Sequence, residues 1–333
     1  MKFPGIPPDL GFFSIFIQTL IPTNPKVTMK ILTIFLTLLC SSLFIQAQRT
    51  VDAVQWTGRY GLPQSYEDTY SEKATELGSM LSVSYAAKLG KSTKWAINLN
   101  HFYFNVKGDP AIPDDLANPI VINGIILRTG IQQQLGNDWM LQLLAAPRLM
   151  SDFRNLDGNS FQMGVVASLE KKFSDQLFMG YGAMYNQERF GPYLVPLVNL
   201  EWYITDRWSI TGMLPVTGRV NYRINDNFFL GFNHFGLITS YYLGEDAYSG
   251  DYMERQSIDL SLYARHRLFS VLFLEAMAGR SFGRSYTQYA GDQKVDFAIP
   301  LVTFGDNRTA KNVTFSDGML LNLKLVINVN RPE

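Results

Sequence analysis

Residues 258–265 read Ile-Asp-Leu-Ser-Leu-Tyr-Ala-Arg, and this alternation decides the fold. Side chains of a β-strand point to opposite faces in turn, so every second residue shares a face. Ile258, Leu260 and Leu262 therefore form an apolar face. Asp259 and Arg265 lie on the opposite face. A strand of this kind fits between an apolar phase and water.

The same period recurs along the rest of the chain. Alternating apolar residues occupy the segments 81–89, 95–99, 125–131, 139–145, 161–169 and 319–329. No long window has the 3.6-residue period of an amphipathic helix. The sequence therefore predicts an all-β protein whose first strand covers residues 51–60.

The composition supports this prediction. Charged residues make up 17% of the chain, against about 25% in ordinary soluble domains. Aromatic residues make up 14%, yet the mean hydropathy is only −0.02. Low charge without high hydropathy is typical of strands that alternate apolar and uncharged polar residues.

Basic and acidic residues number 29 each, so the chain lacks the positive field that attracts nucleic-acid phosphates. We expect no nucleic-acid partner.

The N-terminal part predicts export. Residues 29–47 have the pattern of a secretory signal peptide, with Lys30, an apolar run and small residues up to Ala47. The apolar run 31–39 is shorter than the roughly 20 residues of a membrane-spanning helix. Residues 48–333 are then the exported domain. We expect residues 1–28, which contain five prolines, to be a start-site artefact or a disordered extension.

Two kinds of connection separate the predicted strands. Short turns, such as 136–138, 205–207 and 225–227, alternate with longer loops, such as 107–119, 151–160, 244–255 and 287–315. Bacterial outer-membrane barrels combine short periplasmic turns with long extracellular loops. The sequence therefore predicts a single closed antiparallel transmembrane β-barrel in the bacterial outer membrane, because closure gives every backbone group a partner in lipid.

The number of strands follows from the turns. Six short turns, with both chain ends on the periplasmic side, require 14 strands. If residues 208–223 do not form a full pair, 12 strands remain.

Four tryptophans lie beside the predicted short turns: Trp95, Trp139, Trp202 and Trp208. Tryptophan concentrates at the level of the lipid headgroups, where its ring keeps one end wet. We interpret these residues as a periplasmic aromatic girdle. The alternative is a soluble sandwich whose core is closed by aromatic residues.

Several short segments carry a resemblance to a known family. Residues 146–152 read Ala-Pro-Arg-Leu-Met-Ser-Asp and lead into a predicted outer loop. Further along the chain lie Pro196, Trp202, Asp206, Trp208, Leu214-Pro215 and Val220-Asn221-Tyr222. With these segments the chain resembles uncharacterised outer-membrane β-barrel proteins of the Bacteroidetes type. The resemblance implies a barrel in the outer membrane, but no activity and no catalytic residue.

Charged residues on the predicted inner face of the strands are candidates for the lining of the lumen. They are Arg128, Arg148, Glu170, Glu201, Asp259, Arg265 and Glu275. Such groups either face water and select solutes, or pair across the lumen and hold the barrel rigid. The sequence leaves both interpretations open.

Little in the sequence indicates catalysis. Gly279-Arg280-Ser281-Phe282-Gly283 matches a hydrolase pattern that requires a following helix, and none is predicted. His101, Asp109 and Ser281 would have to meet at the outer rim to form a lipid-modifying enzyme. We therefore expect no enzyme activity and no cofactor. Because Cys40 lies in the signal peptide, no thiolate metal site is expected either.

Two functions remain as the main hypotheses, and a membrane-embedded lipid-modifying enzyme remains as a remote alternative. The first is a passive channel for small solutes, and the alternative is a plugged barrel with a structural or loop-mediated binding role. The expected partners are outer-membrane lipid, lipopolysaccharide and the barrel insertion machinery. Acidic loop residues such as Asp152 and Asp251 are expected to be solvated loop tips.

Overall fold

A computed structural model describes residues 50–67, 70–248 and 250–330. The predicted extension and signal peptide lie outside these residues. The chain divides into two units, Asp52–Asn328 and Met1–Val51 with Val329–Glu333, and the barrel is described within the first. No helix in the described ranges is long and apolar enough to cross a membrane.

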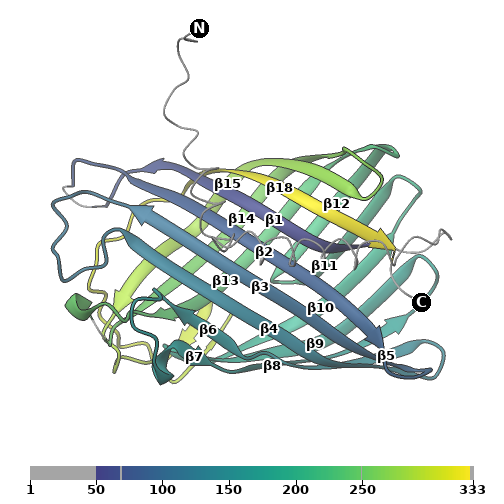
Figure 1. The fold of residues 1–333 in the computed structure, drawn as a ribbon, viewed down its shortest axis with the longest axis horizontal. Coiled ribbons are helices and arrows are strands. Elements are labelled where there is room, and N and C mark those ends of the chain that lie inside the picture. Colours follow the sequence, from purple (N-terminus) through teal and green to yellow (C-terminus); the bar gives the residue numbers. More distant parts are fainter. Residues whose placement is uncertain (1–49, 68–69, 249, 331–333) are drawn as a thin grey trace, which may run out of the picture. The chain divides into compact units, whose positions relative to one another are not determined.

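Eighteen strands and two short 3-10 turns make up the described fold (Figure 1). The strands are β1 (Thr50–Gln64), β2 (Ala74–Lys88), β3 (Thr93–Lys107), β4 (Ile120–Leu135), β5 (Trp139–Ala145), β6 (Arg148–Ser151), β7 (Phe161–Gln162), β8 (Gly164–Lys172), β9 (Leu177–Glu188), β10 (Gly191–Tyr203), β11 (Trp208–Leu214), β12 (Thr217–Asn225), β13 (Phe228–Tyr242), β14 (Tyr252–Arg267), β15 (Leu272–Tyr289), β16 (Phe297–Ile299), β17 (Val302–Phe304) and β18 (Gly318–Asn330). The 3-10 turns are η2 (Gly158–Ser160) and η3 (Asp246–Tyr248).

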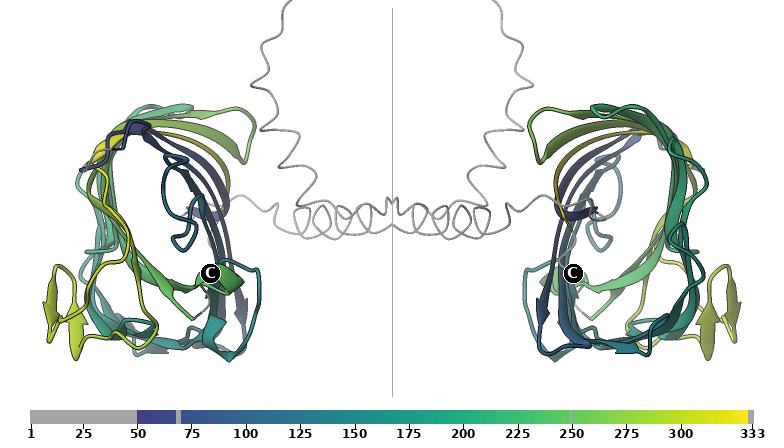
Figure 2. Two further views of the ribbon diagram at one scale, coloured as in Figure 1. Left: turned by 90° about the vertical axis from the view of Figure 1, so that its left-hand side faces the viewer. Right: turned by 90° about the vertical axis from the view of Figure 1, so that its right-hand side faces the viewer.

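The strands close into one antiparallel ring of 14 wall positions (Figure 2). Neighbours along the chain pair with one another, and β18 pairs with both β15 and β1. β5 and β6 share one position against β4, interrupted at Pro147, which has no N–H to donate. β7 and β8 share the next position, and the β16–β17 hairpin projects beside the ring. The predicted closed 14-strand barrel is confirmed.

The uncertain part of the strand count is resolved at β11 and β12. These strands pair from Trp208↔Tyr222 to Met213↔Thr217 and join β10 to β13. They contain only 7 and 9 residues, whereas β10 and β13 contain 13 and 15. The pair therefore completes the ring, but the wall is lower there than on either side.

The two ends of the barrel have different connections. We call the end with the six short turns the inner end. Its turns include residues 136–138, where Gly136 has a φ of 67° that favours glycine. The outer end carries the long loops, among them residues 290–317 with the β16–β17 hairpin. Two outer connections are nevertheless only two residues long, 189–190 and 215–216.

The outward face of the wall is apolar. Large apolar side chains that point outward include Leu143, Leu169, Leu262 and Leu323, of which Leu262 is 70% exposed. Inward neighbours such as Ser261 and Tyr263 are buried. The alternation first seen in residues 258–265 thus places apolar groups outside and polar groups inside.

Apolar side chains from opposite walls meet inside the outer half of the barrel. Ile126 of β4 and Met150 of β6 are buried in one cluster with Tyr241 of β13 and Met253 of β14. We call this group, with Phe104 of β3, the outer apolar cluster. A second buried cluster joins β8, β9 and β10 to Tyr252 of β14. Both clusters narrow the lumen at this level.

The backbone also crosses the interior near the outer end. Tyr242 of β13 pairs with Ser151 of β6, although these strands are not neighbours in the ring. Asp152 extends this link, because its backbone N–H donates to the Tyr242 carbonyl at 3.0 Å. Its carboxylate accepts from the backbone of Gly244 at 2.9 Å. The expectation that Asp152 is a solvated loop tip is wrong, since this residue is buried and joins two loops.

The outward face generates a test of the fold. If lipid surrounds this face, Leu262→Arg should lower the free energy of unfolding by about 2–4 kcal/mol, the cost of arginine near the bilayer midplane. Leu268→Arg, at an exposed inner turn, should cost about 0–1 kcal/mol. Denaturant titration of the refolded protein in lipid vesicles measures both values. Equal costs at the two positions would contradict the placement of Leu262 in lipid.

Candidate functional site: the charged interior of the barrel

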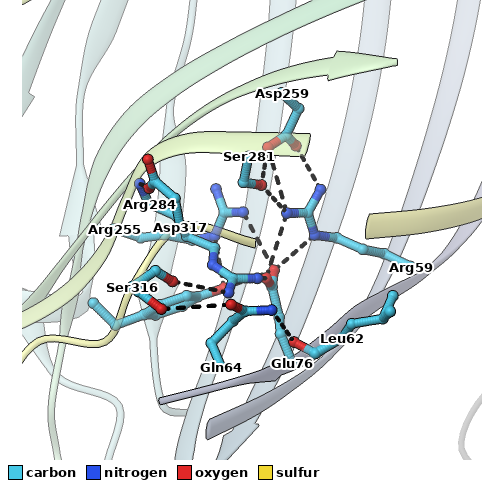
Figure 3. A network of polar contacts seen from close by, with 11 residues as sticks. Arg59, Leu62, Gln64, Glu76, Arg255, Asp259, Ser281, Arg284, Ser316 and Asp317 are labelled. Carbon is cyan, nitrogen blue, oxygen red and sulfur yellow. Dashed lines mark hydrogen bonds and ion pairs between the residues drawn. The ribbon is translucent and has the colours of Figure 1, made fainter. Parts of the chain in front are cut away.

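A network of buried charges occupies the interior (Figure 3). It consists of Arg59, Glu76, Arg255, Asp259 and Arg284, and we call it the central network. Each of these side chains points inward from β1, β2, β14 or β15 and is at most 4% exposed. Arg284 does so because a register shift beside Gly283, whose φ is 55°, moves the inward face of β15 by one residue. Side chains from strands far apart in the sequence thus meet in one place.

Arg59 links the two carboxylates of the central network. Its Nε lies 2.7 Å from Glu76 Oε1, and its Nη1 lies 2.5 Å from Asp259 Oδ2. The Ser281 hydroxyl donates to Asp259 and accepts from Arg59 Nη2 at 2.9 Å. Asp259 was predicted to face the lumen, and the structure places it inside the barrel in an ion pair.

The Glu76 carboxylate contacts more than one guanidinium group, so its single negative charge does not balance them all. Arg284 Nη1 lies 2.9 Å from Glu76 Oε2, and Arg255 Nη2 lies 3.5 Å from Glu76 Oε1. The Arg255 guanidinium also lies 3.9 Å from the centre of the Phe104 ring. Three guanidinium groups thus share two carboxylates, and the aromatic face offsets part of the excess charge.

A second group, which we call the inner network, lies nearer the inner end. Glu275 is fully buried and lies 2.7 Å from Arg219, 3.4 Å from Lys324 and 4.0 Å from Arg265. Arg265 also contacts Asp52 at 2.8 Å. The predicted inner-face residues Arg265 and Glu275 are thus brought together, in a group of three cations and two carboxylates.

The third group joins the β9–β10 turn to β13. Arg148 Nη1 lies 2.7 Å from Glu188, and Arg148 Nη2 donates to Asn186 at 2.6 Å. The other carboxylate oxygen of Glu188 accepts from the Ser240 backbone at 2.9 Å and the Ser240 hydroxyl at 2.8 Å. Arg148, predicted to line the lumen, is 4% exposed and held by these contacts.

The remaining predicted lining residues are half-buried. Arg128 donates to Asn98 Oδ1 at 3.1 Å, and Glu170 accepts from Asn199 at 2.8 Å. Glu201 of β10 lies opposite Thr211 of β11, below the outer apolar cluster. These three residues belong to none of the three buried groups, so the predicted residues do not form one continuous site.

The four tryptophans lie on the outward face near the inner turns. Trp95, Trp139, Trp202 and Trp208 are between 40% and 45% exposed. The Trp95 indole donates to Thr129 at 2.8 Å, and the amine of Lys171 lies 5.1 Å from the centre of the Trp139 ring. The rings of Trp95 and Trp139 therefore combine an apolar surface with a polar contact, as an interfacial position requires.

Ion pairs also fix the outer loops. Arg308 lies 2.7 Å from Glu254 and 2.9 Å from Asp306. The hydrogen bonds from Arg308 hold the pKa of Asp306 below its usual range. Lys311 contacts Asp251 at 2.6 Å, and Asp251 is 8% exposed. Asp251 therefore joins loops, and the expectation of a solvated tip is wrong for it too.

Sequence reasoning missed most of the central network. Arg59 and Glu76 were not singled out, although both occupy inward positions of alternating segments. Applying the alternation to residues 54–60 and 74–82 would have placed both inside. Glu188 and Arg255 lie near strand ends, where the sequence pattern does not distinguish a buried charge from a loop charge. Arg284 follows the register shift at Gly283, which breaks the alternation of β15.

The residues considered for catalysis are not brought together. Ser281 is buried inside the barrel and hydrogen-bonded to Asp259. His101 shares the outward face of β3 with Leu99, because the two residues are two positions apart. Asp109 accepts hydrogen bonds from its own loop and from Glu72. Among the described residues, no group of three or more His, Cys, Asp or Glu side chains could hold a metal ion.

Glu76→Gln tests the central network. The substitution leaves three buried guanidinium groups with one carboxylate, so the free energy of unfolding should fall by about 3–5 kcal/mol. The matched control is Glu201→Gln, at a half-buried position, where the loss should be below about 1 kcal/mol. Denaturant titration in lipid vesicles gives both values. A Glu76→Gln variant as stable as the unchanged protein would show that the network does not support the barrel.

Several solved structures are similar to this chain. An outer membrane channel from Pseudomonas putida F1 is 10% identical, with a TM-score of 0.42 over 86% of this chain and 97% of the channel. The P. putida toluene transporter TodX is 9% identical, with a TM-score of 0.35 over 87% and 92%. A Pseudomonas aeruginosa FadL homologue is 10% identical, with a TM-score of 0.30 over 85% and 90%.

No curated protein matches the chain at a significant level. A family model described as a domain of unknown function (DUF6268) matches residues 49–298, which include the ring from β1 to β15 and the first part of the β16–β17 hairpin. The predicted membership of an uncharacterised family is thus confirmed, while its Bacteroidetes origin stays a prediction. The chain belongs to the DUF6268 family.

Proposed function

We propose that this protein spans the bacterial outer membrane and passes small solutes through a narrow lumen. The apolar outward face, the closed backbone ring and the tryptophans near the inner turns support the location. The predicted signal peptide would deliver the chain to the periplasm, from which the insertion machinery would place it in lipid.

The observation that carries the proposal is the change in the side chains that line the interior, from the inner end of the barrel to the outer end. The inner half holds charged groups such as Glu201 and the inner network. Above them, apolar side chains of the outer apolar cluster meet from opposite walls. Arg255 of the central network packs on Phe104 of this cluster, so the constriction combines apolar side chains with charges that are already paired. A narrow lumen of this kind admits small solutes more readily than large solutes or fully hydrated ions. The protein is on this account a selective passage and not a wide pore.

A specific observation favours the second candidate, a plugged barrel. Tyr242 of β13 pairs with Ser151 of β6 across the interior, and Asp152 reinforces that link. A backbone crossing of this kind could seal the outer mouth permanently. The outer loops would then carry the function by binding lipopolysaccharide or another ligand.

Single-channel recording in planar bilayers separates the two candidates. We expect small current steps from the unchanged protein and severalfold larger steps from Met150→Ala, which removes a buried side chain from the constriction. Met163→Ala, on the exposed side of the wall, is the matched control and should leave the steps unchanged. A heat-dependent gel shift checks that each protein is folded and inserted. Silence from inserted unchanged protein and inserted Met150→Ala would establish the plugged barrel instead.

Ion selectivity tests the proposed role of Glu201. Its carboxylate lies in the inner half of the lumen, so Glu201→Gln should shift the reversal potential in a salt gradient toward anions. Glu72→Gln, in the exposed loop before β2, should shift it much less. An identical reversal potential for Glu201→Gln and the unchanged protein would remove Glu201 from the conducting lining.

The absence of enzyme activity and the lipid, lipopolysaccharide and insertion-machinery partners also belong to this proposal. The partners follow from the barrel location. The expected absence of enzyme activity is supported by the buried position of Ser281, away from His101 on the outward face of β3.

A further inference from the structure

A small cavity lies inside the barrel beside the low part of the wall. Its volume is about 40 Å³, which is room for about two or three water molecules. Met184 of β9, Val195 of β10, Val216 of the β11–β12 turn and Ile238 of β13 line it, and so does Met150 of the outer apolar cluster. The cavity therefore reaches from the wall to the constriction.

The β-ladder between β10 and β13 is interrupted in the wall beside this cavity. Pairing of β10 with β11 ends at Val198↔Leu214, and pairing of β12 with β13 ends at Thr217↔Phe235. Beyond these points, the described parts of β10 and β13 show no backbone pairing with each other. Beyond the β11–β12 pair, β16 of the outer hairpin pairs with β10 at Tyr193↔Ala298, so the wall beside the cavity has no continuous β-ladder between β10 and β13.

Two guanidinium groups face this mainly apolar cavity. Arg128 and Arg148 both line it, and they are close neighbours because Arg148 lies opposite Ile126 on the adjacent strand. Glu188 balances Arg148 at 2.7 Å. Arg128 contacts only the neutral Asn98 in the described ion pairs and hydrogen bonds. The cavity thus contains one positive charge that no carboxylate offsets.

Both arginines retain unused hydrogen-bonding capacity at this place. The Nε atoms of Arg128 and Arg148 are buried without a hydrogen-bond partner. A buried unpaired donor of this kind is costly, and a charged one more so. A bound anion would offset the charge of Arg128 and accept hydrogen bonds from it.

We propose that this cavity binds an organic monoanion whose charged end contacts Arg128 and whose apolar part lies among Met150, Met184 and Val216. The apolar lining disfavours a fully hydrated inorganic ion, because burial of such an ion in this surface has no compensating contacts. The unbranched methionines can change rotamer and enlarge the cavity for a ligand longer than the present volume holds. The inference deepens the proposed function, since it names the class of solute.

Binding of hexanoate tests the site, with hexan-1-ol as the uncharged probe of the same length. Calorimetric titration uses the full protein in lipid nanodiscs in 150 mM chloride (on the order of physiological ionic strength), with empty nanodiscs as the blank. We expect saturable hexanoate binding that is at least about tenfold weaker in Arg128→Gln, a loss of about 1.4 kcal/mol. Hexan-1-ol binding should change little in this variant, because only the charged contact is removed.

A second variant keeps the test independent of Arg128. Val216→Phe fills part of the cavity and should weaken the binding of both hexanoate and hexan-1-ol. Arg223→Gln, at a partly exposed position near the inner end, is the matched control and should change neither. Three results would overturn the proposal. They are no saturable hexanoate binding, hexanoate binding that added chloride abolishes, and equal hexanoate binding by all three variants.

Conductance of the same preparations separates this inference from the proposed function. If the protein binds hexanoate through Arg128 but gives no current steps, the binding site is supported and passage through the lumen is rejected. Current steps without hexanoate binding would keep the passage and reject the site.

Discussion

The backbone ring is the constraint on which the rest of this structure depends. Every N–H and C=O group in lipid must have a partner within the protein, and a sheet satisfies this only when its edges meet. The pairing of β18 with β1 meets that requirement. Closure then fixes which side chains face outward on every strand, because side chains alternate between the two faces and paired strands share the same faces.

The interior follows from this constraint. Residues that alternate with the apolar outward face must fill the barrel, and many of them are charged. Burial is costly for single charges, so the chain assembles them in groups, as Arg59 shows by contacting both Glu76 and Asp259. Each strand position thereby affects groups on distant strands, and the central network holds β1, β2, β14 and β15 in one register.

The sequence was sufficient for the fold because its signals are local. Alternation in segments such as 258–265, the turn residues and the long loops each predict the barrel independently, and the structure agrees with them. The pair β11 and β12 was the uncertain case, since segments of 7 and 9 residues are short for strands in a bilayer. Their neighbours supply pairing partners on both sides, and that tertiary contact cannot be seen in the local pattern.

The interior site was predicted less completely, for a physical reason. The sequence shows that Arg148 and Asp259 face inward, but not which partners cross the lumen to meet them. Those partners depend on the diameter of the ring and on the inward path of β13, which brings Tyr242 to Ser151. Both features arise only when all strands are assembled, so Glu188 and Arg284 were not recognised as interior residues.

The central claim is that these strands cross a membrane as a closed, tilted barrel. Polarised infrared spectroscopy of the protein in oriented bilayers measures strand orientation directly. The account predicts amide I dichroism corresponding to strands tilted by about 35–45° from the bilayer normal, as in known outer-membrane barrels. Strands without a preferred orientation, or strands lying flat on the bilayer surface, would contradict it.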